Sequence, residues 1–105
     1  MSVAYGPCST LVVFDGELDL ATLHDLREEV DQLLAFAPSV VVLDLARVEF
    51  IDSMGVVLLL QIWQGIVHHQ GGTLEVAAVS PAAHRVLDMC GLAHVFTVDD
   101  AAHLV

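Results

Sequence analysis

The residues with the clearest chemical potential lie at the start of an apolar helical pattern, in the segment Phe50-Ile51-Asp52-Ser53-Met54-Gly55. Asp52 and Ser53 are both good N-cap residues, and the first N–H groups of a helix have no partner within the helix. These donors and the positive end of the helix dipole favour a phosphate group at this position. Ser53 can therefore be a helix cap, a nucleophile or a phosphorylation target.

Ser53 lacks the surroundings of an enzyme nucleophile. A hydrolase elbow has the pattern Gly-x-Ser-x-Gly, and a histidine activates its hydroxyl. Here Ile51 stands two residues before Ser53, only Gly55 fits the pattern, and no histidine can be assigned to the hydroxyl. We expect no catalytic residue and no enzyme activity.

The histidines do not form a metal-binding pattern. His68 and His69 are adjacent on a predicted helix and point about 100° apart, so they cannot face one ion as an i, i+4 pair does. No glycine-rich phosphate loop follows a predicted strand. We therefore expect no metal and no cofactor, with surface positions for the six histidines His24, His68, His69, His84, His94 and His103.

The composition predicts one domain over residues 1–105 that acts through a partner. The hydrophobic fraction is 56% and the mean hydropathy is +0.73. The longest uninterrupted apolar run of the central helix, Met54 to Leu60, is far shorter than the roughly 20 residues that span a membrane. With no signal-peptide pattern, we expect a cytoplasmic protein without membrane insertion, whose surplus apolar surface serves a partner.

The charge disfavours nucleic-acid binding, and the cysteines give no support for a redox function. A net charge of −11 with only Arg27, Arg47 and Arg85 as basic residues disfavours nucleic-acid binding. The acidic charge either draws the domain to a basic protein surface or serves solubility alone. Cys8 and Cys90 do not form a CxxC motif. We expect an ordinary thiol at Cys8 and a small buried thiol at Cys90.

Strand and helix patterns alternate along the chain. Such alternation predicts an α/β domain, here with a mixed sheet of four to five strands and helices packed on it. The strands are expected at 9–14, 40–45, 73–79 and 95–98, and the helices from Thr22 to before Pro38, from Ser53 to about His69, and from Pro81 to Gly91, with a further helix start at 99–102.

Two features are expected to flank Ser53. If the central helix buries Val56, Leu60 and Trp63, then Met54 and Leu58 face away from the core and form either an apolar docking patch or a surface that another element covers. The acidic segment 15–19 is expected as a loop after the first strand. It would emerge beside Ser53 if the first two strands are parallel, at the sheet edge where open α/β sheets bind ligands. Asp19 can also cap the first helix.

Several segments in order resemble a STAS domain, above all the stand-alone bacterial anti-sigma factor antagonists. The Asp-Ser-x-Gly element is the specific part of this resemblance. The matching segments are Gly16-Glu17-Leu18-Asp19-Leu20-Ala21-Thr22, Val42-Leu43-Asp44-Leu45, Phe50-Ile51-Asp52-Ser53-Met54-Gly55, Ser80-Pro81-Ala82-Ala83-His84-Arg85-Val86-Leu87 and Gly91-Leu92.

The resemblance implies that the protein binds an anti-sigma factor that is also a serine kinase, and so releases a sigma factor. The kinase would phosphorylate Ser53 and a serine phosphatase would reverse this, while Asp19 would help engage the kinase and Asp52 matches the acid before the acceptor. Met54 stands where a second serine is common, and the family's C-terminal helix is short or missing. The partner-binding residues expected from pattern and resemblance are Glu17, Asp19, Asp52, Met54, Gly55 and Leu58.

Two other functions remain open for a STAS-like domain. The same fold can be a docking subunit of another assembly, such as a lipid-transport complex or a stress-signalling scaffold. It can also sense a small molecule at the strand ends.

Overall fold

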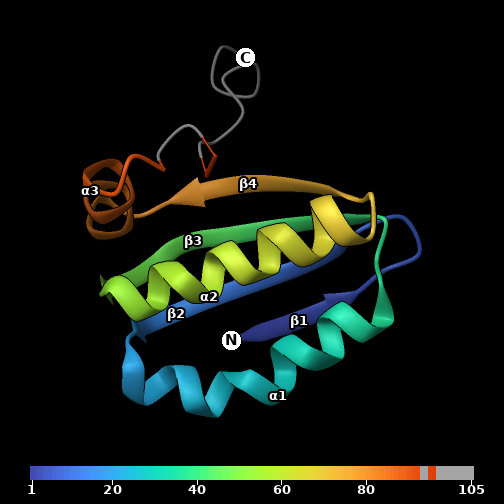
Figure 1. Ribbon diagram of the computed structural model, residues 1–105, viewed down its shortest axis with the longest axis horizontal. Coiled ribbons are helices and arrows are strands. Elements are labelled where there is room, and N and C mark those ends of the chain that lie inside the picture. The colour runs from blue at the N-terminus through green and yellow to red at the C-terminus, as the bar shows by residue number, and fades with distance from the viewer. Residues whose placement is uncertain (93–94, 97–105) are drawn as a thin grey trace.

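A computed structural model describes residues 1–92 and 95–96, which form a four-stranded mixed sheet in the order β1-β2-β3-β4 (Figure 1). β1 runs antiparallel to β2, whereas β2, β3 and β4 are parallel. The mixed sheet confirms the predicted fold class, but β1 carries no strand pattern that we recognised. The elements are β1 (Ser2–Tyr5), β2 (Thr10–Leu18), α1 (Leu20–Phe36), β3 (Val40–Ile51), α2 (Ser53–Trp63), the π-helix η1 (Gln64–His69), β4 (Thr73–Val79) and α3 (Pro81–Met89).

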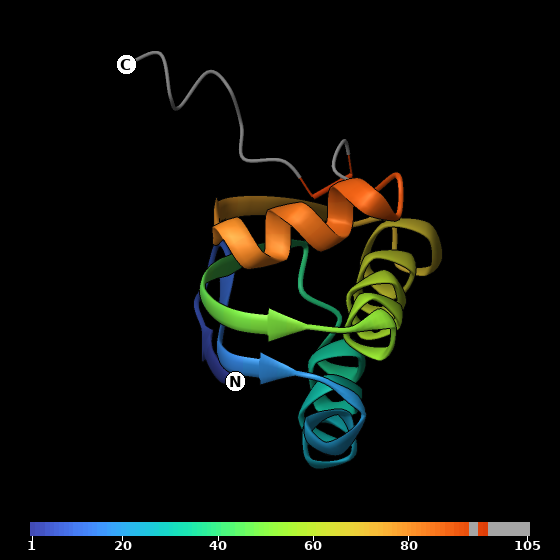
Figure 2. The ribbon, with the colours of Figure 1, turned by 90° about the vertical axis from the view of Figure 1, so that its left-hand side faces the viewer.

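The core lies between the sheet and the two longest helices. Figures 1 and 2 show α1 and α2 on the same face of the sheet, while α3 packs against β3 near the carboxyl ends of the strands. Alternate residues of each strand enter this core because successive strand side chains point to opposite faces. The fully buried residues include Val12, Phe14, Leu43 and Leu45 from the strands and Leu33, Leu59 and Ile62 from the helices.

β2 is longer than predicted and contains part of the expected acidic loop. Asp15, Gly16 and Glu17 belong to the strand, which continues to Leu18. The pairing with β3 shifts register between Val13 and Asp15 and again between Gly16 and Glu17, and Gly16 has a φ of 75°. These bulges place turn-type residues within a strand, so the predicted loop over 15–19 is wrong.

α2 buries a different face from the predicted one. Val56 is buried as expected, but Leu58, predicted to face outward, is only 1% exposed, whereas Val57 is 39% exposed. Leu60 and Trp63 are partly buried at the side of the core. α2 packs against α1 as well as the sheet, so its buried arc is wide and lies about a quarter turn from the predicted one, given 100° per residue.

The helix that begins at Ser53 extends to His69 as predicted, although its last part is π-helical. Gly65 lies in this part, where a Cβ atom would come within 2.5 Å of Leu34 Cδ2. The side chain of Gln70 donates a hydrogen bond to the carbonyl of Leu34 just after the π-helix. The end of the helix is thus fitted closely to α1.

The segment after β4 follows the prediction up to Gly91. Ser80 caps α3 by accepting a hydrogen bond from the Ala83 N–H, Pro81 begins the helix, and Gly91 has a φ of 73°. Cys90 is exposed, which corrects the predicted buried thiol; Cys8 is exposed too.

The predicted strand over 95–98 begins at residues that are not in a strand. Val95 and Phe96 lie in a turn and a bend, and Phe96 is buried. The rest of that predicted strand, 97–98, and the predicted helix start at 99–102 lie outside the described residues.

Candidate functional site

The ends of β2 and β3 bring the acidic segment 15–19 and the Asp52-Ser53 helix start together. Leu18 and Ile51 are partners in the parallel register, and the Asp52 N–H donates a hydrogen bond of 3.1 Å to the Leu18 carbonyl. Each strand is followed directly by an aspartate that begins a helix, Asp19 before α1 and Asp52 before α2. The expectation that both segments emerge at one edge of the sheet is confirmed.

Asp52, and not Ser53, caps α2. Its Oδ1 accepts hydrogen bonds from the N–H groups of Met54 at 2.9 Å and Gly55 at 3.0 Å. Ser53 is the first residue of the helix, it is exposed, and no hydrogen bond within the described part of the chain engages its hydroxyl. Of the three roles open to Ser53, the helix cap is therefore excluded.

Asp19 caps α1 through a reciprocal pair of hydrogen bonds. Its carboxylate accepts from the Thr22 N–H at 3.0 Å, while the Thr22 hydroxyl accepts from the Asp19 N–H at 2.9 Å. The backbone hydrogen bond from Thr22 lowers the pKa of Asp19 below its usual value, although desolvation acts in the opposite direction. Asp19 is therefore ionised at neutral pH.

Gly55 allows the start of α2 to approach β2 closely. A Cβ atom at this position would collide with the Leu18 carbonyl oxygen and would lie 2.8 Å from Ile51 Cγ1. Gly55 and Leu58 are both buried, so neither can contact a partner directly. Gly55 instead holds the neighbouring Ser53 at the sheet edge.

A groove between α1 and α2, with apolar and polar lining residues, lies beside Ser53. Leu20 is 64% exposed and Val57 is 39% exposed on its two sides, and Val57 stands one helical turn from Ser53. A hydrogen bond of 2.7 Å from Arg27 Nη1 to Gln61 Oε1 links the two helices. The groove is lined by Leu20, Leu23, His24, Arg27, Met54, Val57 and Gln61. We call Leu20, Leu23, Ser53, Met54 and Val57 the Ser53 surface.

Leu20 and Val57 were not predicted as residues of this site. Leu20 follows the cap Asp19 directly, and an apolar residue at the first position of a capped helix is a signal that could have been used. Phe50, which is paired with Glu17 at the ends of β3 and β2, is a further exposed apolar side chain near this edge. Met54, which we expected to face outward, is half-buried and lines the groove.

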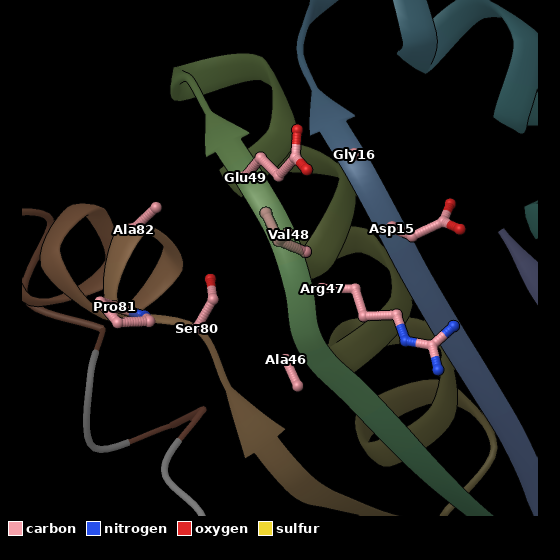
Figure 3. Close-up of a pocket in the computed structure, with 9 residues that line it drawn as sticks. All are labelled: Asp15, Gly16, Ala46, Arg47, Val48, Glu49, Ser80, Pro81 and Ala82. Carbon is pink, nitrogen blue, oxygen red and sulfur yellow. The ribbon is translucent and has the colours of Figure 1, made fainter.

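A second hollow lies beside the start of α3 and has mixed charge (Figure 3). Asp15, Arg47 and Glu49 extend from β2 and β3. Ser80 is already used as the cap of α3. The residues that line this second hollow are Asp15, Gly16, Ala46, Arg47, Val48, Glu49, Ser80, Pro81 and Ala82.

Residues 1–92 and 95–96 contain no group of three or more histidine, cysteine, aspartate or glutamate side chains that could hold a metal ion. The four histidines in these ranges, His24, His68, His69 and His84, are all exposed. In the same ranges, no helix has the length and apolar character needed to cross a membrane.

The chain belongs to the STAS domain family, whose model matches residues 3–104. It is 32% identical over 91 residues to the anti-sigma F factor antagonist of Paenibacillus polymyxa, covering 86% of this chain and 77% of that protein. It is 31% identical over 88 residues to the anti-sigma-F factor antagonist RsfB of Mycobacterium tuberculosis, covering 84% and 70%.

Solved structures give the same fold. An anti-sigma factor antagonist from Mycobacterium paratuberculosis superposes with a TM-score of 0.75 at 28% identity, covering 99% of this chain and 91% of that one. Unphosphorylated SpoIIAA, also described as an anti-sigma factor antagonist, has a TM-score of 0.75 at 20% identity, covering 96% and 90%. The second likeness supports the fold alone.

Proposed function

We propose that this STAS domain is an anti-sigma factor antagonist of the cytoplasm. It binds an anti-sigma factor that is also a serine kinase, releases a sigma factor, and has no catalytic activity of its own. The names of its relatives support this function, since two of them are more than 30% identical over most of the chain. The observation that carries the proposal is the Ser53 hydroxyl, which is exposed, free of hydrogen bonds within the described residues, and next to the groove between α1 and α2.

Phosphorylation of Ser53 switches the protein off in this proposal, and a serine phosphatase switches it on again. A phosphate adds about −1.5 to −2 charges at pH 7. The helix N-terminus tolerates this charge, but the Asp52 carboxylate already accepts the N–H groups of Met54 and Gly55. The phosphate must therefore stay hydrated, which prevents a partner from covering the Ser53 surface. Each 1.4 kcal/mol lost in this way lowers affinity about tenfold.

The other proposed contact residues divide into an acidic and an apolar group. Glu17, Asp19 and Asp52 form an acidic rim that attracts a basic kinase surface. Met54, with Leu20 and Val57, supplies apolar contact area. Gly55 and Leu58 act indirectly, because they position the start of α2 from within the core.

Phosphorylation is tested with purified candidate anti-sigma factor kinases and ATP, followed by intact-mass and peptide analysis. We expect one phosphate on Ser53, none on Ser53→Ala, and normal modification of the control Ser9→Ala, whose side chain is exposed on the loop between β1 and β2. Phosphate found only on another residue would refute the switch. Tight binding that no kinase modulates would instead favour a docking subunit of another assembly.

A further inference from the structure

One face of the sheet is open over β1 and β2. α1 and α2 cover the opposite face, and no described helix lies over the first two strands on the open side (Figure 2). The pairing register identifies the side chains on this face, because residues directly opposite one another share a face of the sheet. Val12 and Leu43 are paired and fully buried on the side of α1 and α2. The residues one position before them on each strand therefore form a row of side chains on the open side. This row consists of Ala4, Leu11, Val42 and Glu75.

A second row lies two residues further along the strands. It consists of Ser2, Val13, Asp44 and Ala78. The two rows together place Leu11, Val13 and Val42 next to one another, since neighbouring strands are about 4.8 Å apart and the rows about 7 Å apart. Leu11 is 40% exposed, and Val13 and Val42 are half-buried. We call Leu11, Val13, Val42, Asp44 and Glu75 the open-face surface.

Acidic side chains lie next to this apolar centre. Asp44 and Glu75 belong to the two rows, and Asp15 lies two residues after Val13 on β2. In the adjoining hollow, Asp15 and Glu49 are accompanied by a single base, Arg47 (Figure 3). A second copy of this chain, with its charge of −11, would bring acid against acid. The charges instead complement a basic partner.

We propose that the open-face surface is a docking site for an amphipathic helical segment of a partner protein, with an apolar stripe flanked by lysine or arginine. A helix is the element that covers an open sheet face in such folds, as α1 and α2 do on the other side. The helix diameter of about 10 Å matches the width of two strands. Because this surface and the Ser53 surface lie on opposite faces of the sheet, one molecule can hold both partners at once.

The test uses synthetic peptides and the amide NMR spectrum of the full isotopically labelled chain. The probe has about 18 residues, five helical turns, with leucine at i, i+3, i+4 and i+7 spacing and lysine elsewhere. We expect shifts at Ala4, at 11–13 and at 42–44. Two control peptides, one with glutamate in place of lysine and one with serine in place of leucine, should bind at least about tenfold more weakly, a difference of 1.4 kcal/mol.

Variants separate the apolar from the ionic contribution. Leu11→Thr introduces a β-branched residue, which strands favour, while removing apolar contact area. Glu75→Lys reverses a charge at an exposed position of the edge strand β4. Each should weaken binding of the leucine–lysine peptide several-fold while the chain stays folded. Leu20→Thr on the Ser53 surface is the matched control and should leave binding unchanged. Unchanged affinity in both test variants, or shifts confined to the groove between α1 and α2, would overturn the proposal.

Two other occupants would also overturn it. One is a second copy, which would appear as concentration-dependent shifts at Leu11 and Val42 without peptide. The other is residues 97–105 of the same chain, which would give nuclear Overhauser contacts to the Leu11 methyl groups.

Discussion

The assignment of the α2 cap to Asp52 leads to a sharp contrast between two neighbouring alanine substitutions. Asp52→Ala removes the acceptor of both the Met54 and the Gly55 N–H groups. Loss of an aspartate cap costs about 0.5–2 kcal/mol, and we expect the upper half of that range because two donors lose their partner. Ser53→Ala removes a hydroxyl that makes no hydrogen bond to residues 1–92 or 95–96 and substitutes a better helix former, so the free energy of unfolding should change by less than about 0.5 kcal/mol.

Thermal unfolding measures this contrast well in so small a domain. A change of 1 kcal/mol shifts the Tm by about 4–8 °C for 60–100 residues. Asp52→Ala should therefore melt roughly 5–16 °C lower than the wild type, whereas Ser53→Ala should stay within about 4 °C of it. Urea titration of the same variants checks that the slope is unchanged, so that the midpoints report stability alone.

Asp52→Asn is the matched control for the cap. Asparagine caps a helix about as well as aspartate, so this variant should lose much less stability than Asp52→Ala. If Ser53→Ala is destabilised as strongly as Asp52→Ala, the Ser53 hydroxyl is a structural cap after all. Ser53 would then not be free for modification, and the proposed switch at this residue would be refuted.

Four further predictions concern the same edge of the sheet. Gly55→Ala should lower the free energy of unfolding by about 1–3 kcal/mol in urea titration, because its Cβ collides with the Leu18 carbonyl; unchanged stability would mean that α2 shifts freely. Asp19→Asn should keep the α1 cap but bind the kinase more weakly in calorimetry, with the difference shrinking at high salt; equal affinity would restrict Asp19 to capping. The pKa of Asp19 in the folded state lies below the usual 3.8, so its ionised form stabilises the fold above that pH. This contribution is lost as the pH falls through the lowered pKa. The wild type should therefore lose more stability than Asp19→Asn on acidification. Ser53→Ala should bind the kinase and resist inactivation, whereas Ser53→Asp should bind poorly, although one carboxylate carries less charge than phosphate; wild-type affinity of Ser53→Asp would contradict the electrostatic switch.

The elements around Ser53 were predictable because their local signals agree with the fold. The apolar run from Val40, the aspartate before Ser53 and the glycines after His69 each have one dominant structural meaning, and β3, α2 and the end of the helix follow them. The meeting of Asp19 and Asp52 at one edge follows from parallel pairing alone.

The misses come from tertiary contacts that no local pattern contains. Leu58 was placed outside because a single buried stripe was assumed, whereas α1 flanks α2 and widens the buried face. Asp15 and Gly16 resemble a turn, but two bulges keep them within β2 because β3 continues beside them. β1 is a short edge strand, and its pairing with β2 lies outside any local periodicity.

Asp52 caps α2, whereas Ser53 is the proposed phosphorylation site, and this division between two residues has a consequence for the lifetime of the protein. Since Asp52 holds the helix end, adding or removing a group on Ser53 should leave the population of unfolded molecules nearly constant. Proteases that degrade unfolded chains would then remove both forms at the same rate. The amount of protein would stay independent of the signal, and the output would follow the ratio of kinase to phosphatase activity.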